Sequence, residues 1–256
     1  MLGLRNLYRV FHESRAAARK HSALAVMGGS PEAERLASLL GAQRYAKGAE
    51  IVATVTGTRN GGVEISLSGE AVEDARESVF LSAVTKEAVL RELAPYVVSS
   101  LHEDYLISLG RGYPVFRRAV CKELIHKNAR QNAVIGALPI PGADMPAITA
   151  NQGRMVLGIA AAHGEEISLD RARELLGVLA AGFGLRALTR QILKLVPVAG
   201  WAASGAMGYA ATLAMGWTAV RYFERGKREL DPEELSEIRR WAHKEAEAFL
   251  ARMRRR

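Results

Sequence analysis

Cysteine is almost absent from this sequence, which contains only Cys121 among 256 residues. A single cysteine cannot form a disulfide within the chain, which excludes the class of small disulfide-stabilised secreted domains and suits a reducing compartment. Cys121 lies in a helical pattern beside charged residues, so we expect a half-buried and unreactive thiol. The N-terminus also lacks the charged-then-apolar order of a signal peptide, and we therefore expect a cytoplasmic protein.

Side chains with the spacing of a catalytic or metal site are lacking as well. The six histidines are scattered, and only His102 stands in a tight cluster with carboxylates, a pattern more typical of an exposed helix face than of a metal site. The spacing suggests no set of nucleophile, base and orienting residue. We therefore expect no catalytic residues, no metal, no cofactor and no enzymatic activity.

Aromatic residues are few, at 6% of the chain, whereas 49% of the residues are apolar and 24 are glycines. Much of the apolar content is therefore small, which allows helix backbones to approach closely. The net charge of +8 suits nucleic acid, an anionic membrane or an acidic partner. Because aromatic and basic residues do not alternate as in proteins that stack bases, we expect no nucleic acid and favour a membrane surface, with a plain solvated face as the alternative.

Residues 1–110 predict a basic helix followed by a small α/β layer. Residues 1–20 have the pattern of an amphipathic helix, which either packs on its own domain or lies on a membrane. Within 21–110, strands are expected at 24–27, 51–56, 63–67 and 79–82, with one helix ending at Gly41 and another over 86–100. This alternation predicts a mixed sheet.

From residue 115 onward the sequence predicts only helices. One covers 115–137, with Val120, Leu124, Ile125 and Val134 on its apolar face, and the next three end near 162, 196 and 224. Asp231 is expected to cap a last basic amphipathic helix within 231–256. The fold class is therefore α+β, in which a small N-terminal α/β layer precedes an all-helical bundle of Pro-Gly-broken hairpins at 115–226.

The helical region looks like an internal repeat with a break in each half. When Pro139 is aligned with Pro197, Gly142 meets Gly200, and the first break also contains Pro141. Each half is then a helix, a Pro-x-x-Gly break and an Ala/Gly-rich helix. Chance similarity between two Ala/Gly-rich segments is the alternative.

Small residues recur at every fourth position after the second break, at Gly200, Ser204, Gly208, Thr212 and Gly216. Such a ridge lets a neighbouring helix approach closely, in lipid or in water. The uncharged stretch 195–220 is long enough to span a bilayer, but its proline and many small residues weaken insertion. A membrane span, a partly inserted hairpin and a soluble packed bundle therefore all stay open.

Four polar residues interrupt the apolar helix that begins near 144, namely Asp144, Asn151, Gln152 and Arg154. At about 100° per residue, Asp144, Asn151 and Arg154 share one narrow stripe. Asp144 is predicted to cap the helix, with a partner or ligand contact as the alternative. Arg154 is expected to pair with an acidic group across the bundle, and Gln152 and Arg154 to form hydrogen bonds between helices. Together with Pro139, Pro141, Gly142, Gly200, Ser204, Gly208 and Gly216, these are our candidate structural or partner-contact residues.

A family resemblance is carried by two segments, AVIGALPIPGADMPAITANQGRMVLGIAAAHG at 133–164 and LVPVAGWAASGAMGYAATLAMG at 195–216. They resemble the domain of unknown function 697, a bacterial family also found in YcjF-type membrane proteins and attached to Era-like GTPase domains. The PIPGAD turn followed by NQ-x-R is the specific part. The resemblance implies a helical, membrane-associated module that works with a GTPase, and it implies no catalytic residue.

This resemblance invites a comparison of residues 21–100 with a GTPase domain. LAVMGGSPEAERLASLL at 24–40 has the order of strand, Gly-rich turn and helix that holds phosphate in P-loop proteins. However, Glu34-Arg35 stands where a Lys-Ser pair is needed, and the base-reading and magnesium-binding motifs are missing from the sequence. We therefore predict a degenerate, nucleotide-silent relative of a GTPase domain, with an unrelated small α/β domain as the alternative.

The sequence as a whole predicts a non-enzymatic, membrane-associated helical module that serves as partner or scaffold for a GTPase. Its expected location is the cytoplasmic side of the inner membrane. A divergent nucleotide-binding protein and a soluble helical homo-oligomer are the two alternatives.

Overall fold

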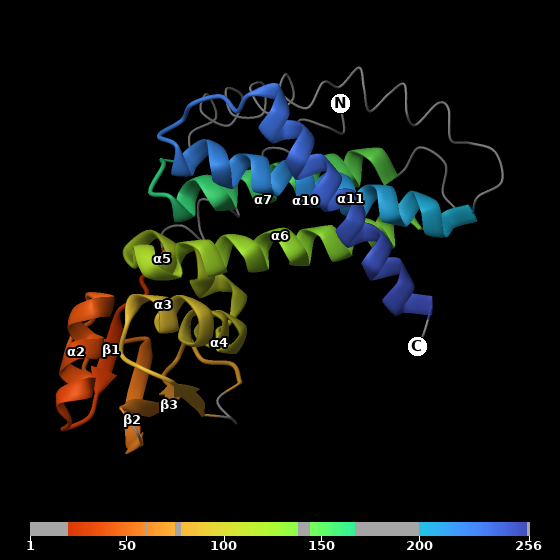
Figure 1. Ribbon diagram of the computed structural model, residues 1–256. Coiled ribbons are helices and arrows are strands. Elements are labelled where there is room, and N and C mark those ends of the chain that lie inside the picture. Colours follow the sequence, from red (N-terminus) through yellow and green to blue (C-terminus); the bar gives the residue numbers. More distant parts are fainter. Residues whose placement is uncertain (1–19, 60, 75–77, 138–143, 167–199, 255–256) are drawn as a thin grey trace. The chain divides into compact units, whose positions relative to one another are not determined.

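The computed structural model describes residues 20–59, 61–74, 78–137, 144–166 and 200–254. The chain forms two compact units, an N-terminal unit of residues 16–123 that also includes 161–164, and a C-terminal unit that takes in 124–160 and 165–256. A small sheet at the N-terminal end is followed by helices (Figure 1), so the predicted α+β class is confirmed.

The sheet has four strands, β1 (Leu24–Met27), β2 (Ile51–Arg59), β3 (Gly62–Ser68) and β4 (Val79–Leu81), in that spatial order. β1 and β2 are parallel, whereas the other two pairs are antiparallel. The predicted mixed sheet and the four expected strands are therefore confirmed. Helix α2 (Pro31–Leu40) joins the parallel strands, because a parallel pair needs a crossover connection.

Both ends of α2 follow from local sequence. The side chain of Ser30 accepts a hydrogen bond from the backbone N–H of Ala33 at 3.2 Å, which satisfies a donor that the first helical turn leaves free. Gly41 ends the helix, as predicted, with φ of 66°, a left-handed conformation that glycine adopts without steric cost.

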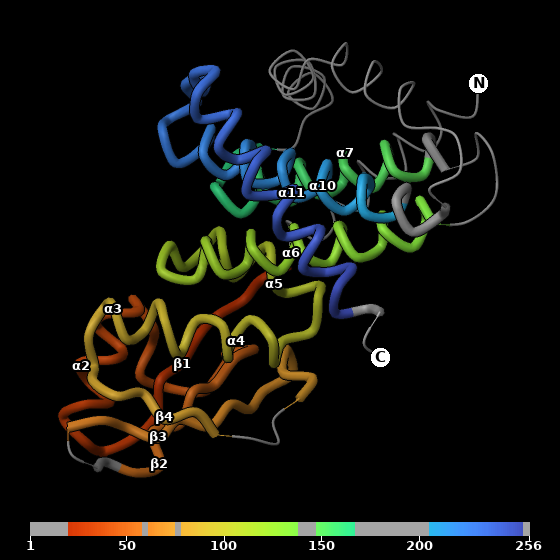
Figure 2. The backbone as a smooth tube through the Cα atoms, turned by 45° about the vertical axis from the view of Figure 1, so that its right-hand side comes forward, coloured from red at the N-terminus to blue at the C-terminus, as the bar shows by residue number. Residues whose placement is uncertain are grey.

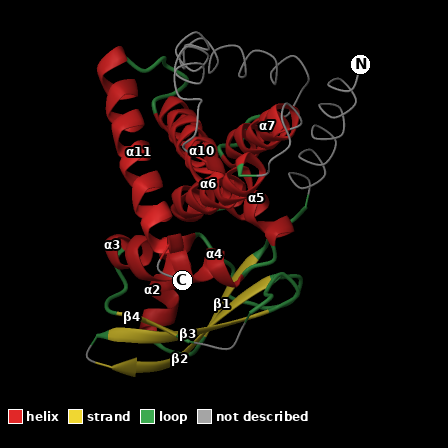
Figure 3. Ribbon diagram, turned by 90° about the vertical axis from the view of Figure 1, so that its right-hand side faces the viewer, coloured by secondary structure: helices red, strands yellow, loops and turns green. Residues whose placement is uncertain are grey.

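One face of the sheet carries the core of the N-terminal unit. Ile51 and Ala53 of β2 and Ile65 and Leu67 of β3 are buried, and the residues between them are half-buried or exposed. Such alternation is typical of a sheet that is covered on one face. In Figure 3, helices α2, α3 and α4 lie on one side of the four strands.

The helix expected over 86–100 is present, but it contains a widened turn. It consists of α3 (Lys86–Ala88), a π-helical turn η1 (Val89–Leu93) and α4 (Ala94–Ser100). Pro95 has no N–H to donate to the carbonyl four residues earlier. In the widened turn the N–H of Ala94 instead bonds to the carbonyl of Val89, five residues back.

Two further helices follow, α5 (Glu103–Gly112), which the sequence analysis did not separate, and α6 (Pro114–Gly136). Cys121 on α6 is fully buried rather than half-buried. The expectation that Val134 shares an apolar face with Ile125 is wrong, because Val134 is 64% exposed. Nine residues separate them, which at about 100° per residue places them on opposite sides of the helix.

The C-terminal unit contains part of α6 together with α7 (Asp144–Ala162), α10 (Gly200–Glu224) and α11 (Pro232–Arg254). Figures 1 and 2 both show α7 and α10 running beside α6. The predicted Asp231 cap is confirmed, since its Oδ1 accepts a hydrogen bond from the N–H of Glu234 at 2.9 Å. The carboxylate of Glu234 in turn accepts from the N–H of Asp231, which completes a capping box.

Helices α10 and α11 form an antiparallel pair through two aromatic contacts. The rings of Tyr209 and Phe249 stack with centroids 4.3 Å apart, and those of Trp217 and Trp241 meet edge-on at 6.0 Å. The helix expected to end near 196 and the breaks at Pro139, Pro141, Gly142 and Pro197 lie outside the described residues. The internal repeat therefore stays a prediction.

Candidate functional site

Helices α6 and α10 approach each other so closely that only glycine fits at two positions of α10. A Cβ atom on Gly208 would lie 2.8 Å from the backbone oxygen of Asn132, and one on Gly205 would lie 2.7 Å from that of Ala133. At Gly216 an added Cβ would lie 2.5 Å from the side chain of Ile125. These glycines therefore bring one helix backbone against the other.

The observed contact face overlaps with the predicted small-residue ridge without matching it fully. Gly208, Thr212 and Gly216 lie on it, but it also includes Gly205, which the sequence analysis did not name. Residues spaced four apart move by about 40° around the helix at each step. Gly205 and Gly216 are instead about three full turns apart, so they lie on the same side of α10. Gly200 begins α10, and the side chain of Ser204 lies outside the described part.

Beside these glycines lies a set of hydrogen-bonded side chains from three helices, which we call the polar layer. Two of its members, Asn132 and Thr212, are fully buried, and Asn151 is 9% exposed. Polar groups that are buried to this extent are costly unless they are hydrogen-bonded. The polar layer consists of Gln131 and Asn132 on α6, Asn151, Gln152 and Arg154 on α7, and Thr212 on α10.

The hydroxyl of Thr212 is the point where the three helices meet. It donates to the backbone carbonyl of Gly208 at 2.7 Å, and it accepts from Nδ2 of Asn132 at 2.8 Å and from Nε2 of Gln152 at 3.3 Å. A hydroxyl has one donor and two acceptor sites. All three are used, so this group holds helices together and has no free site for a ligand.

The amide of Asn151 connects the centre of the polar layer to its edge. Its Nδ2 donates to Oδ1 of Asn132 and to Oε1 of Gln131, both at 3.1 Å. Its Oδ1 accepts from the guanidinium of Arg154 at 3.4 Å, one turn further along α7. The polar layer therefore runs from the exposed Gln131 and the half-buried Arg154 to the fully buried Thr212.

The candidate residues of α7 fall into two groups in the structure. Asn151 and Arg154 are brought together as their spacing predicts, and Gln152 bonds across to α10. Asp144 is the first residue of α7, and its side chain lies outside the described residues. The sequence analysis missed Asn132. This residue lies two turns from Ile125 on the buried side of α6, and a polar residue on an apolar helix face could have indicated a buried hydrogen bond.

The turn between β1 and α2 has the order of a P-loop but different chemistry. Its helix carries Glu32 and Glu34 in the first turn, and Ser30 already caps it. The guanidinium of Arg44 donates to the carbonyl of Gly28 at 2.6 Å. A phosphate-binding turn holds its ligand with free backbone N–H groups, and the carboxylates of Glu32 and Glu34 would repel an anion placed at this one. Descent from a GTPase domain remains a prediction.

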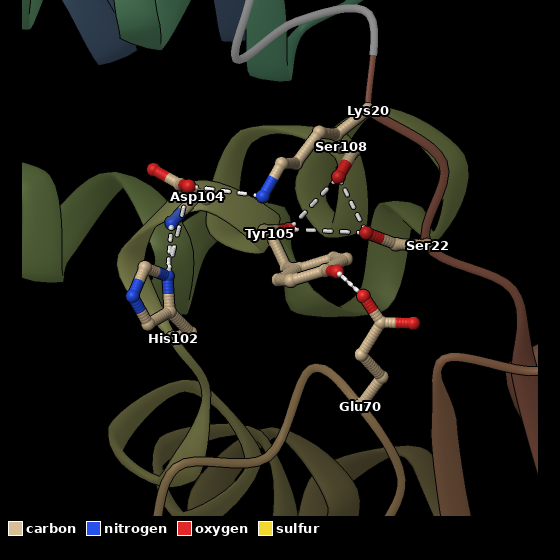
Figure 4. A network of polar contacts seen from close by, with 7 residues as sticks. All are labelled: Lys20, Ser22, Glu70, His102, Asp104, Tyr105 and Ser108. Carbon is tan, nitrogen blue, oxygen red and sulfur yellow. Dashed lines mark hydrogen bonds and ion pairs between the residues drawn. The ribbon is translucent and has the colours of Figure 1, made fainter.

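A second polar cluster surrounds the start of α5 in the N-terminal unit (Figure 4). Nζ of Lys20 lies 2.9 Å from Oδ2 of Asp104 and 4.4 Å above the ring of Tyr105. The hydrogen bond with Asp104 raises the pKa of Lys20. The phenol of Tyr105 donates to Glu70 at 3.1 Å, and this bond raises the pKa of Tyr105. These contacts tie the segment before β1, through Lys20, and the segment after β3, through Glu70, to α5.

Neither a metal-binding cluster nor a helix able to cross a membrane is found among the described residues. They contain no group of three or more His, Cys, Asp or Glu side chains placed to hold a metal ion. No helix in the part of the chain that the structure describes is both long and apolar enough to cross a membrane. The first five residues of the uncharged stretch 195–220 lie outside that part.

The helices that carry the polar layer lie in the part of the chain that matches a known protein family. No curated protein and no solved structure matches the chain significantly. A family model described as a domain of unknown function, DUF697, matches residues 114–247, which is more than half of the chain and includes all of α6, α7 and α10. The chain therefore belongs to the DUF697 family.

Proposed function

We propose that this protein is a non-enzymatic helical module that binds an anionic membrane surface and serves as a partner or scaffold for a GTPase. The observation that carries the non-enzymatic part is the hydrogen-bonded polar layer. The most buried polar side chains of the C-terminal unit bond to one another, as in the full set of bonds at Thr212. Side chains engaged in this way support a fold rather than a reaction.

The membrane part of the proposal rests on charge. The chain carries a net charge of +8, and Arg239, Arg240 and Lys244 are exposed close together on α11. Trp241 stands among them with 39% of its surface exposed. Each cationic side chain near an anionic leaflet contributes about 1 kcal/mol, and tryptophan favours the membrane–water interface.

Sedimentation of the full chain with vesicles tests this part. We expect binding to phosphatidylcholine vesicles that contain phosphatidylserine, release as salt is raised, and no binding to phosphatidylcholine alone. Replacing Arg239, Arg240 and Lys244 with Gln should weaken binding, whereas the same change at the exposed residues Arg35, Lys47 and Lys86 should have less effect. Full recovery in the supernatant with anionic vesicles would contradict the proposal.

The GTPase part rests on the family resemblance, since such modules are attached to Era-like GTPase domains. A GTPase gene next to the gene for this protein would support the partnership. We expect the purified GTPase to bind the full chain with an affinity that differs between its GDP and GTP forms. A GTPase whose binding and hydrolysis rate are both unaffected by the chain would count against partnership.

A further inference from the structure

We propose, building on the membrane binding proposed above, that α11 enters an anionic membrane interface with the side that packs on α10, so that its far end must leave α10 to bind. The start of α11 stays in place, because Glu234 is paired with Arg225 at the end of α10. The surface that meets lipid is therefore the apolar side of α11 rather than the side that is exposed in the structure.

The apolar side of α11 is formed by side chains at helical spacing. At about 100° per residue, they lie within an arc of about 80° around the helix. Phe249 stacks on Tyr209 of α10, with ring centroids 4.3 Å apart. The members of the apolar side are Leu235, Ile238, Ala242, Ala246 and Phe249.

This side of α11 is only lightly buried. Between residues 232 and 252, only Ala242 and Ala246 are fully buried, with 1% and 2% of their surface exposed, whereas the larger members of the apolar side are half-buried. On α7, by contrast, every residue in the range 155–162 is buried. Because the free energy of burial scales with apolar area and alanine has little, α11 is held on α10 by few contacts, among them the stack of Tyr209 and Phe249.

Basic side chains flank the apolar side. When Ala242 is taken as its centre, Arg239 and Arg252 lie about 60° and 80° away, one on each flank. Both are exposed, and their long stems let the guanidinium groups reach lipid headgroups while the apolar residues enter the interface. Glu245, at about 60°, is the acidic residue nearest to this centre.

The outer side of α11 carries charges of both signs. The carboxylates of Glu233, Glu237 and Glu247 are exposed there, about 140–180° from the centre of the apolar side. Arg240 and Lys244 lie among them. Carboxylates that outnumber cations give no net attraction to an anionic leaflet. If α11 stayed on α10, this mixed side would face the lipid, so the charges favour the apolar side instead.

Helix α11 is also built to remain helical without α10. Asp231 and Glu234 form the capping box at its start, and Pro232 occupies the first position, where a missing N–H is tolerated. The helix has 23 residues, most of them good helix formers such as alanine, glutamate, leucine and arginine. Such a helix can exchange a protein surface for a membrane surface without unfolding first.

Sedimentation of the full chain with phosphatidylcholine vesicles that contain phosphatidylserine tests which side binds. In the double variant Arg239→Gln and Arg252→Gln we expect the affinity to fall at least tenfold, because both flanking cations are lost. The matched control is Arg240→Gln and Lys244→Gln, which removes the same charge from the outer side and should lower the affinity less than threefold.

A second pair of variants tests whether α11 leaves α10. Tyr209→Ala and Phe249→Ala break the same ring stack, but only Tyr209→Ala leaves the apolar side of α11 complete. We therefore expect Tyr209→Ala to bind the vesicles at least threefold more tightly than the wild type. Phe249→Ala should bind at least threefold less tightly than Tyr209→Ala.

Equal losses in the two charge variants, or a larger loss in the outer one, would show that α11 binds in its docked position and would overturn the proposal. A folded Tyr209→Ala variant that binds no more tightly than the wild type would do the same. The charge variants alter only exposed side chains, so they decide the question even if Tyr209→Ala does not fold. In these cases the wild type still binds and the proposed membrane function stands, whereas a wild type that does not bind removes both.

Discussion

Asn132 on α6 donates a hydrogen bond from Nδ2 to the hydroxyl of Thr212 on α10 at 2.8 Å, and both side chains are fully buried. This single contact lies beside the closest approach of the two helices, where Gly208 meets the backbone of Asn132. Polar specificity and steric fit are thus combined at one point of the bundle, and their contributions can be separated by mutation.

Thr212→Val removes the hydroxyl but keeps the shape of the side chain. The donors of Asn132 and Gln152 then lose their acceptor inside the core, and we expect the free energy of unfolding to fall by about 1–3 kcal/mol. Urea denaturation followed by circular dichroism measures the change. Thr212→Ser, which keeps the hydroxyl, is the control and should lose only the methyl contribution, roughly 1 kcal/mol. A valine variant as stable as the wild type would show that these bonds contribute nothing.

Gly208→Ala tests the close approach of α6 and α10. The added Cβ would lie 2.8 Å from the backbone oxygen of Asn132, so the helices must separate, which we expect to cost about 1–3 kcal/mol. The control is Gly112→Ala at the end of α5, an exposed position where no atom of the described residues lies within 4 Å, and it should change the free energy of unfolding by less than about 1 kcal/mol. A clear loss at Gly208 with little change at Gly112 in urea denaturation supports the packing described, and equal effects would contradict it.

Glu92 on η1 predicts a pH dependence in the N-terminal unit. The backbone N–H of Ser82 donates to the carboxylate of Glu92 at 2.7 Å, and Nη2 of Arg91 donates to the same carboxylate at 2.6 Å. These two hydrogen bonds lower the pKa of Glu92 to about 2. Because the pKa in the folded state is below the value in the unfolded chain, the carboxylate stabilises the fold at neutral pH, and this contribution is lost as pH falls from about 4.5 towards 2.

The measurement compares Glu92→Gln with the wild type in urea at several pH values. We expect the variant to unfold at lower urea at pH 7, and the two midpoints to converge as the pH is lowered below about 4.5. A difference that stays constant down to the lowest pH would mean that the charge of Glu92 is not responsible.

Nucleotide binding at the turn between β1 and α2 is expected to be absent. Ser30 caps the helix, Glu32 and Glu34 would repel a triphosphate, and the sequence has no lysine in the place of the P-loop lysine. Calorimetry with GTP and ATP in the presence of magnesium should give no binding heat at high protein concentration. Measurable heat would instead favour the divergent nucleotide-binding alternative.

Local structure was well predicted because it depends on neighbouring residues. The cap at Asp231, the stop at Gly41 and the four strands all follow from short-range hydrogen bonds, backbone preferences and the alternation of apolar residues. The turn η1 is an exception, since Pro95 alone does not determine whether a helix breaks or widens. The separate helix α5 was also missed.

The candidate site was predicted only in part. Asn151, Gln152 and Arg154 were singled out because they interrupt an apolar helix, but their partners Asn132 and Gln131 lie some 20 residues away on α6 and were not. The strict four-residue ridge likewise missed Gly205, which reaches the contact face because a helix turns every 3.6 residues. Which partner each polar residue finds depends on how the helices are rotated against one another.

The sequence by itself determined the four strands, most of the described helices, the α+β class and the membership of the helical part in its family, because these depend on local preferences and on motifs. Only the tertiary structure decided which face of α10 meets α6, and that Asn132, Asn151 and Thr212 share one polar layer. Those choices depend on the simultaneous packing and hydrogen bonding of segments far apart in the chain, which no local pattern encodes.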